Sequence, residues 1–132
     1  MIDFNLKAHE YSPLVLAYIG DSVYEVYIRS RFVSEHNDKV SHLHKMSSKF
    51  VCAAAQAKGY EIIKDILTEE EEAIYKRGRN AKSATTPKNA DVCAYRCATG
   101  VEALIGYLYI KKEYDRIETL MTKIFEGIVK ED

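Results

Sequence analysis

Three carboxylates stand in stretches of the sequence that are otherwise apolar. Asp21 and Glu25 lie within AYIGDSVYEVYI, and Glu102 is the only charged residue between Cys97 and Ile110. A carboxylate that is buried without a partner costs several kcal/mol or takes up a proton. Two apolar segments that each carry a lone acid therefore predict a shared positive partner for Asp21 and Glu102.

A divalent cation is one such partner. Mg²⁺ prefers oxygen ligands and needs only one or two carboxylates, because water and phosphate oxygens complete its shell. The residues also allow three alternatives, since each acid could pair with a distant Lys or Arg, lie at a dimer interface, or be less buried than the apolar pattern suggests. Glu25 has a nearer partner, because Arg29 lies one helical turn further on. Asp21 and Glu102 are thus the candidate metal ligands.

Two glycines, Gly20 and Gly100, lie close to these acids in the sequence. Glycine inside a helix costs about 1 kcal/mol relative to alanine, so its presence there needs a reason. A small residue beside each acid would let two helices approach closely enough for both carboxylates to reach one ion. Ordinary helix crossing, which also favours glycine, explains the pattern equally well.

Helices must position these acids, because glycine and proline are scarce and strand-like alternation is hard to find. Ser12 and Pro13 form an N-cap followed by proline, which predicts a helix from there to about Val33. Thr86-Pro87 repeats that signal and predicts a helix that reaches about Lys112. Both helices are apolar on every side, which is typical of helices at the centre of a bundle. The sequence therefore predicts an all-α domain.

Local signals divide the rest of the chain. Asp38 is a candidate cap for a helix that ends near Gly59. Thr68 and Glu71 match the capping-box pattern at the start of another helix. The remaining expected elements are helices at residues 60–67 and 113–129 and a polar loop at 80–86.

The composition limits the class of protein. A length of 132 residues suits one compact domain with its own core. No apolar run reaches the roughly 18 residues of a membrane span, and the N-terminus lacks the pattern of a secretion signal. The 3 cysteines indicate reduced thiols, as in the cytoplasm, and not a disulfide framework.

Positive charge is concentrated in one segment, although the net charge is only −1. Between Lys76 and Arg96 there are six basic residues and a single acid, Asp91. Such a segment can bind a polyanion, or it can be a solvated loop whose charges only aid solubility. A second polar cluster, HLHKMSSKF, is equally consistent with nucleic-acid contact and with helix capping.

The acidic helices resemble a known family. LAYIGDSVYE resembles the signature helix of the ribonuclease III endonuclease domain, and VEALIGYLYI resembles its second acidic helix. KRGRNAKSATTPKNADV, together with the length of the chain, is most similar to the compact Mini-III branch. The resemblance covers residues 11–110. It implies a single helical domain that forms a homodimer and cleaves double-stranded RNA with Mg²⁺, or with Mn²⁺ as the alternative ion.

Carried over by position, the resemblance makes Asp21 the catalytic aspartate and Glu102 the second catalytic, metal-binding acid. It implies attack by water and departure of the ribose 3′ oxygen, which leaves 5′-phosphate and 3′-hydroxyl ends. The implied biological role is maturation of the large-subunit (23S) ribosomal RNA precursor, which the residues themselves do not specify. Whether a ribosomal protein helps to present the RNA stays open.

Two departures from the longer members bear on the site. Those members carry two further acids, at the positions of Ala17 and Thr99 here, so the number of bound metal ions is in question. We also expect no double-stranded RNA-binding domain after the nuclease domain, so that the nuclease domain itself is expected to hold the RNA. The residues expected to contact RNA are Arg77, Arg79, Lys82, Ser83 and Lys88, together with His44, Lys45 and Ser48.

Two other functions must be weighed against an endoribonuclease. A non-catalytic RNA-binding or ribosome-assembly module on the same fold predicts loss of Asp21 or Glu102, and both are present. A helical phosphohydrolase acting on nucleotides needs more acids, or a His-Asp pair, on facing helices. The sequence offers no such set in its apolar helices.

Overall fold

The computed structural model describes residues 2–82 and 91–131, and every regular element within them is a helix. The all-α prediction is therefore confirmed. The elements are η1 (Ala8–Glu10), α1 (Pro13–Glu35), α2 (Val40–Val51), α3 (Ala53–Ile63), η2 (Lys64–Ile66), α4 (Glu69–Asn80), α5 (Val92–Ile110) and α6 (Tyr114–Glu131). None of the described helices has the length and apolar character needed to cross a membrane.

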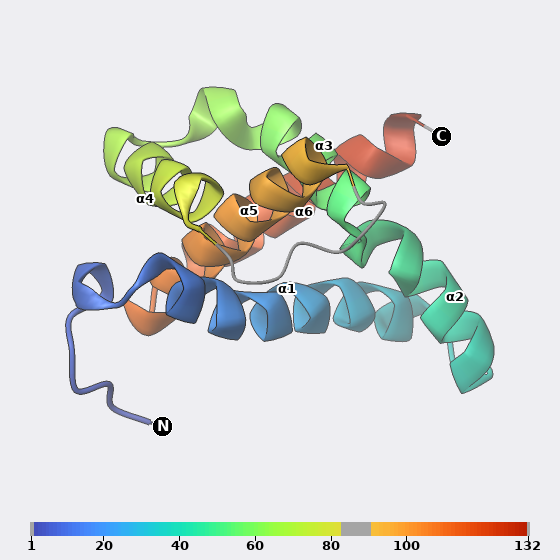
Figure 1. Ribbon diagram of the computed structural model, residues 1–132. Coiled ribbons are helices and arrows are strands. Elements are labelled where there is room, and N and C mark those ends of the chain that lie inside the picture. Colours follow the sequence, from blue (N-terminus) through green and yellow to red (C-terminus); the bar gives the residue numbers. More distant parts are fainter. Residues whose placement is uncertain (1, 83–90, 132) are drawn as a thin grey trace.

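Helix α5 is the central helix, and it contacts α1, α3, α4 and α6 (Figure 1). Every residue from Ala103 to Leu108 is buried, which confirms the central position predicted for this helix. Helix α1 differs, because Val15, Tyr18 and Val26 are 49%, 82% and 60% exposed. The expectation that α1 is buried on all sides is wrong, since this chain covers only part of its surface.

Capping groups set the two helix starts that the sequence predicts best. The Ser12 hydroxyl accepts a hydrogen bond from the Val15 N–H at 3.3 Å, and α1 begins at Pro13. The Thr68 hydroxyl accepts from the Glu71 N–H at 3.1 Å, and the Glu71 carboxylate accepts from the Thr68 N–H at 2.9 Å. The predicted capping box at the start of α4 is therefore confirmed.

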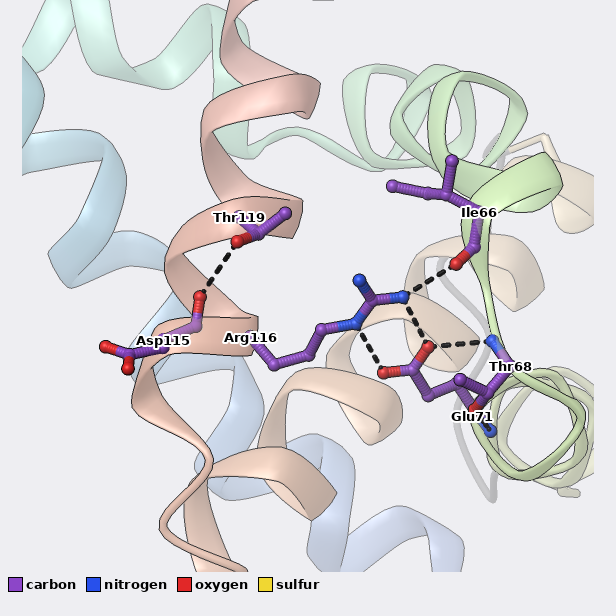
Figure 2. Close-up of polar contacts among 6 residues, drawn as sticks. All are labelled: Ile66, Thr68, Glu71, Asp115, Arg116 and Thr119. Carbon is purple, nitrogen blue, oxygen red and sulfur yellow. Dashed lines mark hydrogen bonds and ion pairs between the residues drawn. The ribbon is translucent and has the colours of Figure 1, made fainter.

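Glu71 also ties α4 to α6, as Figure 2 shows. Arg116 donates from Nε and Nη2 to the two oxygens of this carboxylate, each at 2.8 Å, and Nη2 also donates to the Ile66 carbonyl at 2.7 Å. Burial raises the pKa of Glu71, but the bonds from Arg116 and Thr68 outweigh it and hold the pKa below its usual value. The bidentate pair fixes α4, which packs on α5.

The helix expected to run on to Gly59 is broken at Cys52. The extended backbone of Cys52, with ψ of 159°, ends α2 at Val51 and starts α3 at Ala53. The break is stabilised by tertiary contacts, because Phe50 stacks on Phe125 of α6 with ring centroids 4.8 Å apart. The Gln56 amide donates to the Val51 carbonyl at 3.0 Å, and this carbonyl belongs to the last turn of α2.

Two other predicted starts are shifted. Lys39, not Asp38, is the N-cap of α2, and the Asp38 side chain accepts from the Lys39 N–H at 2.7 Å. Helix α5 begins at Val92, and its N-cap Asp91 accepts from the N–H groups of the next turn. The start predicted at Pro87 is therefore wrong for α5. Thr86 and Pro87 themselves lie outside the described residues.

Candidate active site

Asp21 of α1 and Glu102 of α5 are brought together where these two helices cross. The backbones touch at this crossing, because a Cβ built on Gly20 would lie 1.7 Å from the Glu102 carbonyl oxygen. A Cβ on Gly106 would lie 1.9 Å from the Leu16 carbonyl oxygen on the other side of the same crossing. Two glycines thus allow the close approach that a shared site for the two carboxylates requires.

Gly100 does not take part in this crossing, and that part of the glycine prediction is wrong. A Cβ on Gly100 would lie 2.8 Å from the Tyr75 carbonyl oxygen, so Gly100 faces α4. The reason is helix geometry, because residues two apart point about 200° away from each other. Gly106, four residues after Glu102, shares its face and faces α1 instead.

The two carboxylates have different surroundings. Asp21 is exposed, so the expectation that both acids are buried is wrong for it, whereas Glu102 is half-buried. Burial, with a smaller contribution from the adjacent Asp21 carboxylate, raises the pKa of Glu102 to about 8, and the Gln56 amide opposes both effects. The Glu102 carboxyl group therefore keeps its proton to higher pH than an exposed glutamate does.

Neither acid forms an ion pair with a basic residue of the described ranges. The ion pairs found among residues 2–82 and 91–131 include neither Asp21 nor Glu102. Glu25, by contrast, pairs with Arg29 at 2.9 Å, as the spacing allows. Of the three acids in apolar stretches, Asp21 and Glu102 have no positively charged partner within the described part of the chain. A bound cation would provide one.

No further carboxylate joins the pair from the two positions where the family resemblance implies one. Ala17 is buried one turn before Asp21, and the Thr99 hydroxyl donates to the Tyr95 carbonyl within α5 at 3.0 Å. Within the described part of the chain, no group of three or more His, Cys, Asp or Glu side chains could hold a metal ion. Protein carboxylates here offer two ligands, which suits Mg²⁺ with a largely hydrated shell.

Gln56 of α3 is a site residue that the sequence reasoning missed. Its side chain is buried, and Nε2 donates to Glu102 Oε2 at 3.4 Å and to the Val51 carbonyl at 3.0 Å. Its Oε1 is buried with no hydrogen-bond partner among the described residues. The available signal was a single long polar residue in the otherwise small, apolar stretch CAAAQA.

The predicted RNA-binding residues near the end of α4 have different surroundings. Arg77 donates to the backbone carbonyls of His9 and Tyr11, each at 3.3 Å, and so holds the N-terminal segment on α4. Arg79 lies 5.8 Å from the centroid of the Tyr75 ring, whereas Lys82 is exposed just after the helix. Ser83 and Lys88 lie outside the described residues.

The second predicted cluster lies on the surface of α2. His44, Lys45 and Ser48 are all exposed, and the Ser48 hydroxyl donates to the Lys45 carbonyl at 2.9 Å within the helix. RNA contact by these residues stays a prediction, as it does for the residues near the end of α4.

Comparison with known proteins identifies the family. A family model described as Ribonuclease III domain matches residues 14–113, which include Asp21 and Glu102. The chain belongs to the ribonuclease III family. Mini-ribonuclease 3 from Thermoanaerobacter sp. (strain X514) is 54% identical over 110 residues, which are 83% of this chain and 78% of the relative. Mini-ribonuclease 3 from Enterococcus faecalis is 51% identical over 110 residues, with 82% and 83% covered.

A solved structure shares the fold of this chain. The crystal structure of protein FN1578 from Fusobacterium nucleatum matches with a TM-score of 0.81 and 33% identity, covering 89% of this chain and 94% of that chain. The resemblance to ribonuclease III and to its Mini-III branch is therefore confirmed, and the chain is an endoribonuclease. Ribonuclease III enzymes act on double-stranded RNA and generally depend on a divalent metal ion.

Proposed function

We propose that this endoribonuclease cleaves double-stranded RNA with Mg²⁺ bound between Asp21 and Glu102, and that its substrate is the 23S ribosomal RNA precursor. The observation that carries the site is the meeting of two carboxylates without a basic partner among the described residues. The donor set fits the ion, because both side chains offer carboxylate oxygens and Asp21 is open to solvent. The ribosomal RNA substrate rests on the family resemblance.

The chain's own residues would act by positioning. Asp21 and Glu102 would hold the ion at the α1–α5 crossing, where Asp21 is open to solvent and to a phosphodiester. When bound there, Mg²⁺ would supply activation of water and stabilisation of the charge that develops on the phosphate. Water adds to phosphorus as the bond to the ribose 3′ oxygen breaks and that oxygen takes up a proton, which yields 5′-phosphate and 3′-hydroxyl ends. Mn²⁺ has the same ligand preferences and is expected to substitute.

A homodimer built on α1 is part of the proposal. Val15, Tyr18 and Val26 expose apolar surface on the helix that carries Asp21. A two-fold partner would cover this surface and supply a second copy of the site, so that each copy cuts one strand.

The three cysteines are free, which is consistent with action in the cytoplasm.

RNA binding is assigned to the two clusters on α2 and at the end of α4. The side chains that contribute are His44, Lys45, Ser48, Arg77, Arg79 and Lys82, with Ser83 and Lys88. Lysine and arginine side chains there contact phosphates, and polar groups contact 2′-hydroxyls, since A-form RNA is bound largely by shape. A ribosomal protein that presents the precursor is a further expected partner.

The proposal is tested by cleavage of a double-stranded RNA with and without Mg²⁺. Asp21→Asn and Glu102→Gln keep the size of each side chain but remove its charge, and each is expected to lower kcat/KM by at least about 100-fold. Glu25→Gln is the matched control, because Glu25 lies on the same helix and pairs with Arg29. Amide variants that cut as fast as wild type would refute the site. Full RNA binding without cleavage by the wild type would favour the non-catalytic alternative.

A further inference from the structure

The side chain of Gln56 is a buried amide that bridges two helices. It is only 2% exposed, yet it comes from α3 and reaches Glu102 on α5. Its Nε2 donates to the Val51 carbonyl at 3.0 Å and to Glu102 Oε2 at 3.4 Å, while Oε1 has no partner within the described residues.

A role in folding alone does not account for this arrangement. The bond to Val51 closes the end of α2 and uses one N–H of the amide, whereas the second N–H points at Glu102. The unpaired Oε1 opposes folding, because a buried acceptor without a hydrogen bond is unfavourable. An apolar side chain of similar volume would fill the same space without the free-energy cost of a buried acceptor that has no hydrogen bond.

Glu102 is the member of the acid pair that needs to be held in place. Its longer side chain has more rotamers than that of Asp21, and no basic residue in the described ranges fixes it. Mg²⁺ demands near-ideal octahedral geometry, so a carboxylate that moves among rotamers binds it poorly. Within the described part of the chain, the Gln56 amide donates a hydrogen bond to the Glu102 carboxylate.

We propose that Gln56 is a positioning residue whose amide, anchored on the Val51 carbonyl, holds the Glu102 carboxylate toward Asp21 so that both acids bind one divalent ion. This inference rests on the proposed function, in which Asp21 and Glu102 are the ligands. Gln56 itself does not contact the ion or the RNA. It acts through Glu102, as outer-shell partners of metal ligands do in other proteins.

The test replaces Gln56 by apolar residues of similar size, Gln56→Met and Gln56→Leu. Mn²⁺ alone is titrated into the full chain, and bound ion is measured by electron paramagnetic resonance at a temperature where circular dichroism shows the variant folded. We expect Mn²⁺ affinity to fall about 10- to 100-fold. The half-saturating Mg²⁺ concentration in cleavage should rise by a similar factor, with the KM for RNA unchanged. The urea midpoint in EDTA should stay close to that of wild type, because the lost Val51 bond and the removed unpaired acceptor oppose each other.

Ser47→Ala is the matched control, because Ser47 is also buried but its hydroxyl donates to the His44 carbonyl within its own helix at 3.2 Å. This variant should bind Mn²⁺ as wild type does. If neither apolar variant folds, Gln56→Asn gives the same test, because its shorter amide cannot span Val51 and Glu102 and should also lose affinity.

The outcomes separate this inference from the proposed function. Wild-type Mn²⁺ affinity in the folded Gln56 variants, while Asp21→Asn and Glu102→Gln lose it, overturns the role of Gln56 and leaves the site intact. A loss that only follows the unfolded fraction also overturns the role of Gln56. Unchanged Mn²⁺ affinity in Asp21→Asn and Glu102→Gln removes the proposed site itself.

Discussion

Gly20 packs its Cα directly on the backbone carbonyl of Glu102, and no side chain fits between them. A Cβ at this position would lie 1.7 Å from the carbonyl oxygen, which is a rigid backbone atom and cannot move aside. The residue next to Gly20 is Asp21, so this contact sets how closely the two acids can approach. The geometry of the site therefore depends on the packing of the helices beneath it.

Gly20→Ala is expected to force α1 and α5 apart. The added methyl group should lower the free energy of unfolding by about 1–3 kcal/mol, measured by urea denaturation. Cleavage should fall more than the loss of stability alone predicts, because Asp21 moves away from Glu102 in molecules that are still folded. Gly59→Ala serves as control, since the atom nearest to a Cβ there belongs to the flexible Ile124 side chain, at 3.1 Å, and not to the backbone. Equal activity of Gly20→Ala and wild type would show that the close crossing is not required.

The metal-free enzyme should lose stability as pH rises. Burial and Asp21 raise the pKa of Glu102 from 4.5 to about 8, so the native protein keeps a proton there that the unfolded chain has released. The free energy of unfolding therefore decreases between about pH 5 and pH 8. Glu102→Gln removes this decrease, and urea unfolding in EDTA at several pH values measures it. The same slope in wild type and Glu102→Gln would contradict the assignment.

The Glu71–Arg116 pair is expected to contribute to the stability of the fold and not to RNA cleavage. Arg116→Met leaves the buried Glu71 carboxylate without its bidentate partner, which should lower the free energy of unfolding by about 3 kcal/mol at neutral pH. The lowered pKa of Glu71 makes the stabilisation greatest above the pKa of the unfolded chain, and it is lost as pH falls through the native pKa. The difference between wild type and Arg116→Met in urea should therefore shrink in acid. A constant difference down to low pH would contradict this role of the pair.

Lys82 should contribute to RNA affinity through phosphate contact. It is exposed beyond the end of α4 and takes part in no ion pair found among the described residues. Lys82→Ala is expected to weaken binding of double-stranded RNA and to reduce the slope of log affinity against log salt by about 1. Lys58→Ala, which removes an exposed lysine of α3 outside both clusters, should leave the slope unchanged. An unchanged slope for Lys82→Ala would remove this residue from the RNA interface.

Local chemistry made parts of this fold predictable. Ser12 and the Thr68–Glu71 capping box identify the starts of α1 and α4, because a cap depends only on neighbours in the chain. The break at Cys52 carries no glycine, proline or cap signal. It depends on the packing of Phe50 against Phe125 and on the Gln56 side chain, which are contacts that form only when the helices pack together.

The residues of the site that could be predicted are those whose charge differs from the apolar sequence around them. Asp21 and Glu102 stand out because they are charged residues in apolar helices. Gln56 does not stand out, since a neutral amide on a third helix shows its relation to Glu102 only after folding. The residue that packs beside Glu102 is also predictable from the sequence, because helical spacing puts Gly106, and not Gly100, on the face of Glu102.

The most direct test of the metal site is a crystal structure of the enzyme grown with Mn²⁺ at a concentration that supports full cleavage, with anomalous diffraction recorded at the manganese edge. We predict an anomalous peak within coordination distance of a carboxylate oxygen of both Asp21 and Glu102. A peak that touches neither residue, or the absence of a peak at that concentration, would contradict the account.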